Sequence, residues 1–537
     1  MKQLMIGNLF FSGTMGRELL YINNRLTSRK TYVEWDKKLM GPILDEVGVE
    51  QGGVNSGDFY KIYAKSQLQM AQDSLLGVAL SKDVVISAIG QADDTVLLSN
   101  NLHSLQNLLQ LTLYYCSRYN VELCTGKTKL QAISPSHLQA EVNYLKEFSP
   151  VNIDGVKLKF CDSAEHVGIT RSVTGNLPNI VVRISSHKKA VGAVLRNGLA
   201  KHHSANPAAR LKVEQMYGTP VLLSGLGSLV LSKPEETLIN QHSMDTLCNL
   251  LHLLPNTPHP VIYFLAGSLP GEAMIHLRQL SLLGMISRLT GSLLHQHAVS
   301  VFTKQGNTWS WFHQVRNLCL KYQLPHPLTI LTTPLPKEAF KRLTKKHVVN
   351  YWELKLRDDA APLTSLKYFK PQYMSLTKPH PIFSTAGPSP YEVTKACTQA
   401  RFLSGRYRTE LLCSHWSSNP GGYCLCPSCD GLFIPENIEH ILLHCGSLLS
   451  TRLRLSKFTL KYAMTVPLLS RAILELTKPC NPLFLQFLID CSVIPQVITL
   501  CTDHGQVALH HMFKVSRTWC YSLHRERLKI LGRWIPY

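Results

Sequence analysis

The chain lacks a long apolar run. No segment reaches the roughly 20 consecutive apolar residues that a membrane-spanning helix needs, and the nearest candidate, residues 219–231, is short and contains glycines. We expect that segment to be part of a core. Residues 5–11 are also too short for a signal peptide and are interrupted by Asn8. The sequence therefore favours a protein without membrane helices.

Acidic residues are scarce. The 537 residues include 35 Asp and Glu against 56 Lys and Arg, which gives a formal net charge of +21. A charge of this size favours a polyanionic partner, nucleic acid first and an anionic membrane surface second. The 15 cysteines are scattered and odd in number, so a disulfide framework is not indicated. We therefore expect an intracellular protein, nuclear or cytoplasmic, that is not secreted.

The stretch of residues 84–98 carries the first chemical signal. Two short, β-branched apolar runs are interrupted by Asp93 and Asp94, as expected for two buried strands joined by a tight hairpin. Adjacent carboxylates repel one another and need a counter-ion, and Mg²⁺ suits them because it prefers oxygen ligands. The alternative is a polar β-turn in which the two Asp residues only satisfy turn geometry.

The segments on either side of the Asp pair favour the metal-binding interpretation over the simple turn. Upstream, a glycine-rich loop containing Gln51 and Gly52 runs into a helix, and such a loop allows close approach to a phosphate or a base pair. Downstream, one helix face should cover the sheet. Its residues at helical spacing are Leu102, Leu105, Leu109, Leu113 and Cys116. Residues 121–129 then indicate a strand, a turn and a basic pair.

This order of a Gln51-Gly52 loop, an Asp93-Asp94 hairpin, an amphipathic helix and Lys127 resembles the palm of a non-LTR (LINE-type) retrotransposon reverse transcriptase. The resemblance covers roughly residues 1–175. It implies an RNA-directed DNA polymerase, a nucleotidyltransferase that uses two Mg²⁺ ions, an RNA template, a DNA primer or target, and dNTPs.

The resemblance also implies roles for single residues. Asp93 and Asp94 would bind Mg²⁺, and Gln51, Gly52 and Ser56 would contact the nucleotide and the template. Lys127 would assist departure of pyrophosphate as a general acid, with a solvated turn lysine as the equal alternative. Gly57 and Asp58 depart from the Ser-Pro pattern that the family has after Gln-Gly.

One carboxylate of such a site is missing from the sequence. Two-metal nucleotidyl transfer needs carboxylates from two separate strands, and the family takes the second one from an Asp well before the Gln-Gly loop. Here no Asp precedes Asp36. We therefore expect a chain truncated within the palm and inactive as a polymerase by itself, so its status as an enzyme is uncertain. The alternative function is a non-catalytic remnant that binds RNA or DNA.

We expect an α+β protein with five parts. A partial palm, residues 1–175, should combine an antiparallel sheet with covering helices. A helical thumb-like region would follow at 176–325, then a linker with a basic segment at 326–400. A zinc-binding module at 401–450 and a helical C-terminal region at 451–537 would complete the chain. In the thumb-like region, a helix over 180–199 carries the cations expected to track a nucleic-acid backbone. They are Arg183, His187, Lys188, Lys189 and Arg196.

Residues 337–357 form the basic segment of the linker. Cations are interleaved with Phe340, Tyr351 and Trp352, a combination that suits phosphate pairing and base stacking. A charged helix that merely faces solvent is the alternative. Residues 358–395 contain Pro and Ser and predict an irregular connector.

The second strong motif is a set of metal ligands. Cys426 and Cys429 form a Cys-x₂-Cys pair, and His440 and Cys445 follow on what should be one helix near its end. Three thiolates and an imidazole make a tetrahedral Zn²⁺ set, and four protein ligands indicate a structural ion. Cys424 and His444 are alternative ligands, and free core cysteines are the other interpretation. Similar modules follow the polymerase in LINE-type proteins, where they are thought to help hold RNA.

Overall fold

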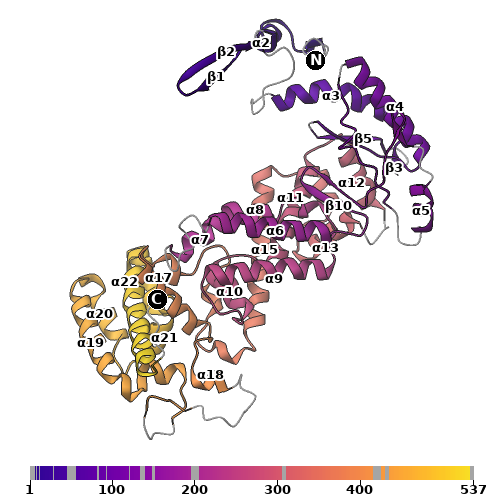
Figure 1. Ribbon diagram of the computed structural model, residues 1–537. Coiled ribbons are helices and arrows are strands. Elements are labelled where there is room, and N and C mark those ends of the chain that lie inside the picture. The colour runs from indigo at the N-terminus through magenta and orange to yellow at the C-terminus, as the bar shows by residue number, and fades with distance from the viewer. Residues whose placement is uncertain are drawn as a thin grey trace. The chain divides into compact units, whose positions relative to one another are not determined.

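The structure is a computed structural model that describes residues 6–7, 9–10, 13–27, 30–44, 56–81, 84–91, 93–119, 121–133, 139–147, 151–194, 205–304, 310–414, 425–429 and 434–532. Its internal contacts define two compact units. The first comprises Met1–Asn179 and Leu289–Gly306, and the second comprises Ile180–Arg288 and Asn307–Tyr537 (Figure 1). The expected α+β class is confirmed, since helices predominate and the strands form small two-stranded antiparallel sheets. The finer division into five parts stays a prediction.

The first unit contains all the named strands. Its elements are α2 (Gly16–Thr27), β1 (Lys30–Trp35), β2 (Lys38–Leu44), α3 (Ser56–Asp73), β3 (Val78–Ser81), β4 (Val84–Ile86), β5 (Ala88–Gln91), β6 (Asp94–Leu97), α4 (Leu102–Tyr119), α5 (Gln139–Glu147), β7 (Asn152–Ile153), β8 (Val156–Lys157), β9 (Ser163–His166), β10 (Ile169–Ser172) and α12 (Leu293–Thr303). The strands pair as β1–β2, β3–β4, β5–β6, β7–β8 and β9–β10. The expected strand at the start of residues 121–129 is absent, because these described residues form only a turn.

Turn chemistry explains one of these hairpins directly from the sequence. Asp154 and Gly155 connect β7 to β8, and both have positive φ, as the two central residues of a type I′ turn require. Asp36 and Lys37 connect β1 to β2 with the same signs, although Lys is not a favoured residue there. The Asp154-Gly155 pair is therefore enough to predict the turn between β7 and β8. No residue pair favoured in such turns marks the one between β1 and β2.

The predicted hairpin around the Asp pair is present, but its strands are short. β5 pairs with β6 in a register that sets Gln91 opposite Asp94, whereas β4 pairs with β3 in a separate sheet. The strands are also less buried than expected, since Ile89 is 47% exposed. Gly90 lies where Leu68 of α3 packs against β5, and a Cβ there would meet that side chain. A glycine at this point thus allows the helix to approach the hairpin closely.

The helix expected to cover the sheet is confirmed. α4 contributes Leu109 to a buried cluster with Leu130, Val151 and Ile153. Partly buried side chains packed against this cluster include Leu102, Leu105 and Leu113. The buried side chains of α4 are Leu108, Leu109, Thr112, Tyr115 and Cys116, so the apolar spacing predicted the helix and two of its buried residues, and the buried face is turned toward Leu108 and Tyr115.

The second unit is helical. Its elements are α6 (Leu177–Val194, whose first turn belongs to the first unit), α7 (Pro207–Val213), the π-helix η3 (Glu214–Gly218), α8 (Thr219–Leu222), η4 (Leu226–Ser228), α9 (Lys233–Leu250), α10 (His259–Ala266), α11 (Gly271–Ser287), α13 (Trp311–Lys321), α14 (Pro327–Thr332), α15 (Lys337–Ala360), η5 (Thr364–Leu366), η6 (Pro371–Tyr373), α16 (Pro381–Ser384), α17 (Pro390–Leu403), α18 (Glu410–Ser414), the π-helix η7 (His440–His444), η8 (Gly446–Leu448), α19 (Leu449–Met464), α20 (Pro467–Leu476), α21 (Phe484–Ile489), η9 (Cys491–Val493) and α22 (Pro495–Ile530). None of the helices that the structure describes is long and apolar enough to cross a membrane.

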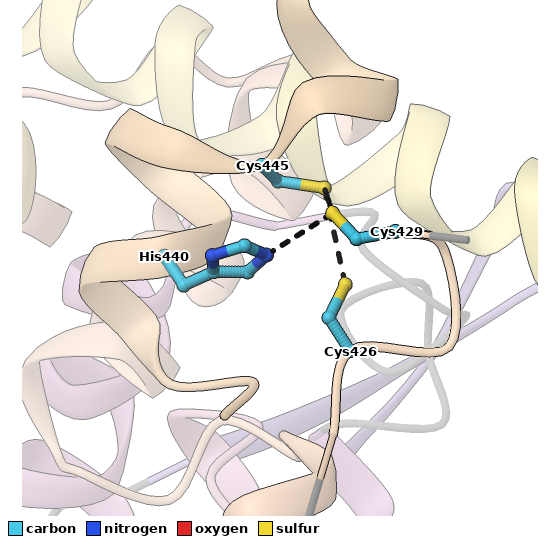
Figure 2. A group of neighbouring side chains, drawn as sticks. All are labelled: Cys426, Cys429, His440 and Cys445. Atoms are coloured by element: carbon cyan, nitrogen blue, oxygen red, sulfur yellow. Dashed lines mark hydrogen bonds between the residues drawn. The ribbon is translucent and has the colours of Figure 1, made fainter. Parts of the chain in front are cut away.

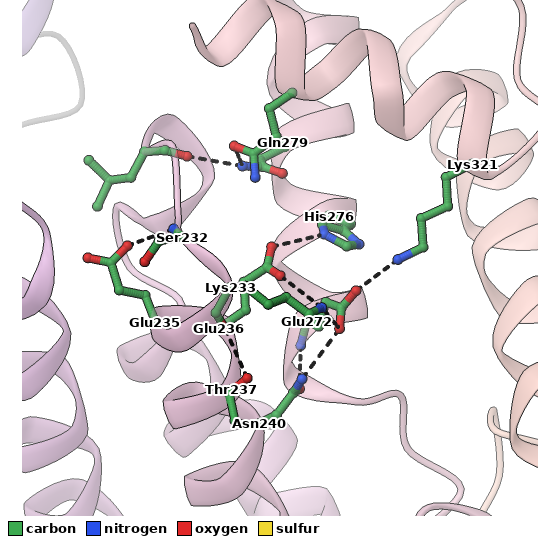
Figure 3. Close-up of polar contacts among 12 residues, drawn as sticks. Ser232, Lys233, Glu235, Glu236, Thr237, Asn240, Glu272, His276, Gln279 and Lys321 are labelled. Carbon is green, nitrogen blue, oxygen red and sulfur yellow. Dashed lines mark hydrogen bonds and ion pairs between the residues drawn. The ribbon is translucent and has the colours of Figure 1, made fainter. Parts of the chain in front are cut away.

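Buried ionic contacts join α9, α11 and α13 (Figure 3). Glu272 on α11 accepts a hydrogen bond from Lys321 Nζ at 2.8 Å and lies 3.6 Å from Lys233 Nζ. Burial alone would raise the pKa of Glu272, but its hydrogen bond with Lys321 lowers it. Beside it, His276 Nε2 lies 3.6 Å from Glu236, and its Nδ1 lies 2.7 Å from the Tyr322 hydroxyl. These contacts pair the buried acids, which would otherwise destabilise the core.

Residues 358–395 are not the irregular connector that we expected. They contain η5, η6, α16 and the start of α17, and they supply buried side chains such as Phe369 and Phe383. At the C-terminal end, α22 contacts α17, α19 and α21. The fully buried Arg517 of α22 donates hydrogen bonds to the carbonyls of Ile382 and Thr385. Proline and serine in this region therefore cap short helices rather than mark a linker.

Candidate metal centre

Cys426 and Cys429 lie on a tight turn supported by a short β-bridge. Leu425 and Pro435 form an isolated antiparallel bridge, and the Cys426 backbone N–H donates to the Ile434 carbonyl at 2.9 Å. The Cys429 N–H donates back to the Cys426 carbonyl at 3.3 Å. The two thiols are thus presented on the same side of the turn, as a Cys-x₂-Cys pair requires.

His440 and Cys445 are brought together by the π-helix η7. The Cys445 N–H donates to the His440 carbonyl at 2.7 Å, which closes a turn between residues five apart. The side chain of Asn437 accepts a hydrogen bond from the His440 N–H at 2.7 Å and so holds the start of this turn. The sequence predicted a helix here. It did not predict that the helix is a π-helix.

The four side chains converge on one point (Figure 2). All four are buried, and their ligand atoms lie within 4.8 Å of one another. Cys429 Sγ is 3.5 Å from His440 Nε2 and 3.6 Å from Cys445 Sγ, and Cys426 Sγ is 4.0 Å from Cys445 Sγ. A tetrahedral zinc with Zn–S bonds of about 2.3 Å sets its ligand atoms roughly 3.5–3.8 Å apart. The group could therefore bind a metal ion such as zinc.

The protonation of the four side chains follows from their surroundings. Burial raises the pKa of the Cys426 thiol, raises that of Cys445 to about 12, and lowers the pKa of His440. Burial alone would also raise the pKa of Cys429, but a hydrogen bond from the Gly446 N–H and those with the neighbouring thiols lower it. Binding a cation would therefore displace protons, chiefly from Cys426 and Cys445.

Charged residues outside the ligand set connect the centre to the rest of the unit. Arg452 of α19 donates to the Cys445 carbonyl at 2.6 Å. Glu436 accepts two hydrogen bonds from Arg527 of α22, each 2.7 Å long, and one from the Glu410 N–H. We did not anticipate these residues, because Glu436 and Arg527 are far apart in the sequence and nothing local to either marks the pair.

The alternative ligands do not join this group. His444 lies on the same π-helix, but its side chain is 63% exposed and lies 3.9 Å from Glu439. Cys424 lies outside the described residues. Three thiols and one imidazole can supply all four ligands of a tetrahedral metal ion, and the structural role predicted for that ion stays a prediction.

The predicted Mg²⁺ ligands lie in the other unit. Asp93 is in the turn between β5 and β6, Asp94 begins β6, and both are exposed. Burial and then the charge of Asp93 raise the pKa of Tyr60 on α3. Within the part of the chain that the structure describes, no further Asp, Glu, His or Cys completes a metal-binding group with the Asp pair. The two carboxylates are exposed, and their role as Mg²⁺ ligands stays a prediction.

The other predicted nucleotide contacts are less well defined. Lys127 is exposed in a turn and donates its backbone N–H to the Cys124 carbonyl at 3.1 Å. Ser56 begins α3, although its side chain is not described. Gln51 and Gly52 lie outside the described residues. No contact between Lys127 and the Asp pair is seen among the described residues.

The thumb-like helix differs from the expectation at one residue. His187 on α6 is buried, with Nε2 2.8 Å from Glu214 Oε1 and Nδ1 2.8 Å from His242 Nε2. It therefore cannot contact a phosphate. Lys188 and Lys189 are exposed, and Arg196 lies outside the described residues.

These features define a mostly helical α+β protein with a buried Cys₃His group that could hold zinc. No known family matches the chain, and no curated protein matches it at a significant level.

Proposed function

We propose that this chain binds nucleic acid and is related to LINE-type reverse transcriptases, with a non-catalytic binding role as its main activity. The observation that carries the binding proposal is the exposed basic face of α15. The net charge of +21 supports it, because a strongly basic chain favours a polyanionic partner.

The two sides of α15 differ sharply in character. Phe340, Val348 and Trp352 are buried, and Trp352 Nε1 donates to the Tyr322 hydroxyl at 3.1 Å. The exposed side carries a row of cations. Those four residues apart are separated by about 6 Å along the helix axis. The cations are Lys337, Lys341, Arg342, Lys345 and Lys346. Phosphate pairing by these cations is therefore the proposed contact, and stacking of bases on Phe340 and Trp352 is excluded by their burial.

Titration of a labelled single-stranded RNA at several salt concentrations tests this proposal. Charge reversal of Lys341→Glu with Lys345→Glu should weaken binding at least about tenfold and flatten the salt dependence, because fewer counterions are released. The matched control is Lys212→Glu with Lys478→Glu, which changes the same charge at two exposed lysines on other segments. An affinity indifferent to salt, or equal losses in both double variants, would contradict a binding face on α15.

A second candidate, RNA-directed DNA polymerase activity, is favoured by the position of the Asp pair. Both carboxylates are exposed at the end of the β5–β6 hairpin, and α3 contacts both β5 and α4. In this proposal Asp93 and Asp94 bind Mg²⁺ and Lys127 assists pyrophosphate departure, while Gln51, Gly52 and Ser56 contact nucleotide and template.

Primer extension on an RNA template with Mg²⁺ and dNTPs distinguishes the two candidates. Polymerase activity requires that Asp93→Asn abolish extension while RNA binding is retained. Asp154→Asn is the matched control, since it makes the same change at an exposed turn with positive φ, which Asn tolerates. Absence of extension in the wild-type protein, together with salt-dependent RNA binding, would leave the non-catalytic role.

A further inference from the structure

Helix α19 has an apolar stripe that no described part of its own unit covers. Its four members are 46–69% exposed. They are Leu449, Leu453, Leu460 and Met464. On a helix of 3.6 residues per turn these positions fall within about 60° of one another, so they lie along one side of the helix rather than scattered around it.

The opposite face of α19 already forms its core contacts. Leu455, Thr459 and Ala463 are buried, and α19 contacts α20 and α22. The hydroxyl of Thr459 accepts a hydrogen bond from Trp519 Nε1 at 2.9 Å, which fixes the rotation of the helix. The stripe therefore cannot turn inward without breaking this packing.

A basic strip runs beside the apolar stripe. It consists of Arg454, Lys457 and Lys461, all exposed, and α19 contains no acidic residue. The nearest acid to Arg454 is Glu526 of α22, with its carboxylate 3.9 Å away. The outer surface of α19 thus offers apolar contact on one side and positive charge on the other.

We infer that this surface of α19 is a docking site for an acidic amphipathic helix of a partner protein. A stripe of about 60° matches the seam presented to a single helix, whereas a helix lying in a membrane surface presents a wider apolar face. Four large apolar side chains have no role in phosphate contact. Two copies of α19 would bring their basic strips together, so a second copy of this chain is also disfavoured.

The metal centre lies at the start of this helix. α19 begins at Leu449, directly after η8, which follows Cys445. Arg452 on its first turn donates to the Cys445 carbonyl, and Ser447 donates to the Ser428 carbonyl on the Cys-x₂-Cys turn. Binding at the docking surface should therefore weaken when the metal is removed, because the orientation of the first turn of α19 depends on the centre.

Binding of a synthetic peptide tests the inference with the full chain. The peptide is a helix with Leu at its a and d positions and Glu at the flanking e and g positions. We expect binding that weakens with salt, and a loss of at least about tenfold in Leu453→Ser with Leu460→Ser, because apolar burial is lost. Leu238→Ser with Leu320→Ser removes two exposed leucines from α9 and α13 and is the matched control. It should bind as the wild type does.

A charge exchange distinguishes specific docking from non-specific binding. Lys457→Glu with Lys461→Glu should lose the acidic peptide and gain affinity for the same peptide with Lys in place of Glu. Circular dichroism and bound zinc should be unchanged in every variant, since all substituted side chains are exposed.

Three results would overturn the inference. The first is no binding of the acidic peptide by the folded wild-type protein. The second is binding to phosphatidylserine vesicles or RNA that depends on Leu453 and Leu460 while the peptide fails to compete. The third is a dimer in sedimentation that Leu453→Ser with Leu460→Ser dissociates. RNA binding through α15 is measured separately, so failure of one proposal does not decide the other.

Discussion

Cys426 and Cys445 are the two candidate metal ligands whose thiol pKa is raised. Both thiols are buried, and burial raises the pKa of Cys445 to about 12. Without a cation they are protonated at neutral pH, and a cation must displace those protons to bind. Metal affinity should therefore rise with pH and fall in acid, because only the thiolate is a ligand.

Replacement of one ligand should release the metal. We expect Cys426→Ser to lose the roughly one equivalent of zinc held by the wild type, as measured by mass spectrometry of the purified protein. Titration of zinc into unbuffered apoprotein should release protons from the wild type and fewer from the variant. Cys480→Ser, at an exposed cysteine, is the control and should retain the metal. Full zinc content in Cys426→Ser would contradict the ligand assignment.

At the scale of single elements, the crossing of α11 and α15 depends on one glycine. Gly284 is a buried residue of α11. In the structure a Cβ at Gly284 would clash with the ring of Phe340 on α15. The same crossing turns the aromatic side of α15 inward and leaves its cations outside, which decides how that basic segment can contact nucleic acid.

We therefore expect Gly284→Ala to destabilise the helical unit by about 1–3 kcal/mol, although Ala is the better helix former. Denaturant unfolding of both proteins measures the difference. In a Phe340→Leu background the added methyl group has more room, so the same substitution should cost less. Equal costs in the two backgrounds would show that Phe340 does not limit the approach of the helices.

At the scale of the whole molecule, two histidines make the stability of the fold depend on pH. Burial lowers the pKa of His242 and of His524 to about 4, from an ordinary value of 6.5. His524 Nδ1 also lies 2.7 Å from the Tyr407 hydroxyl. Below pH 6.5 the unfolded chain binds protons that the folded chain does not. The contribution of these two histidines to stability is therefore fully present above pH 6.5 and is lost as the pH falls toward 4.

Between pH 6.5 and pH 4 the free energy of unfolding should fall by up to about 3 kcal/mol for each histidine. The free energy of unfolding across this range tests it, with His524→Gln compared with the wild type at every pH. Gln does not titrate, so the variant should lose less stability than the wild type on acidification. Parallel pH profiles for the two proteins would exclude His524 as a contributor.

The sequence by itself determined features that depend on neighbours along the chain. The spacing of the leucines predicted helix α4, Asp154-Gly155 is typical of a type I′ turn, and the Cys-x₂-Cys pair with His440 and Cys445 predicted the four-residue metal-binding group. Each needs only local geometry, because the residues concerned lie within a few turns or one hairpin.

Tertiary structure alone decided which side chains became buried and which distant groups met. It set Glu436 against Arg527, His187 against Glu214, and the aromatic side of α15 against α11. It also left the leucines of α19 uncovered, although leucine at helical spacing favours a core. Charge and spacing are fixed by the order of residues, but burial depends on which elements pack together, and that is set by the free energy of the whole unit.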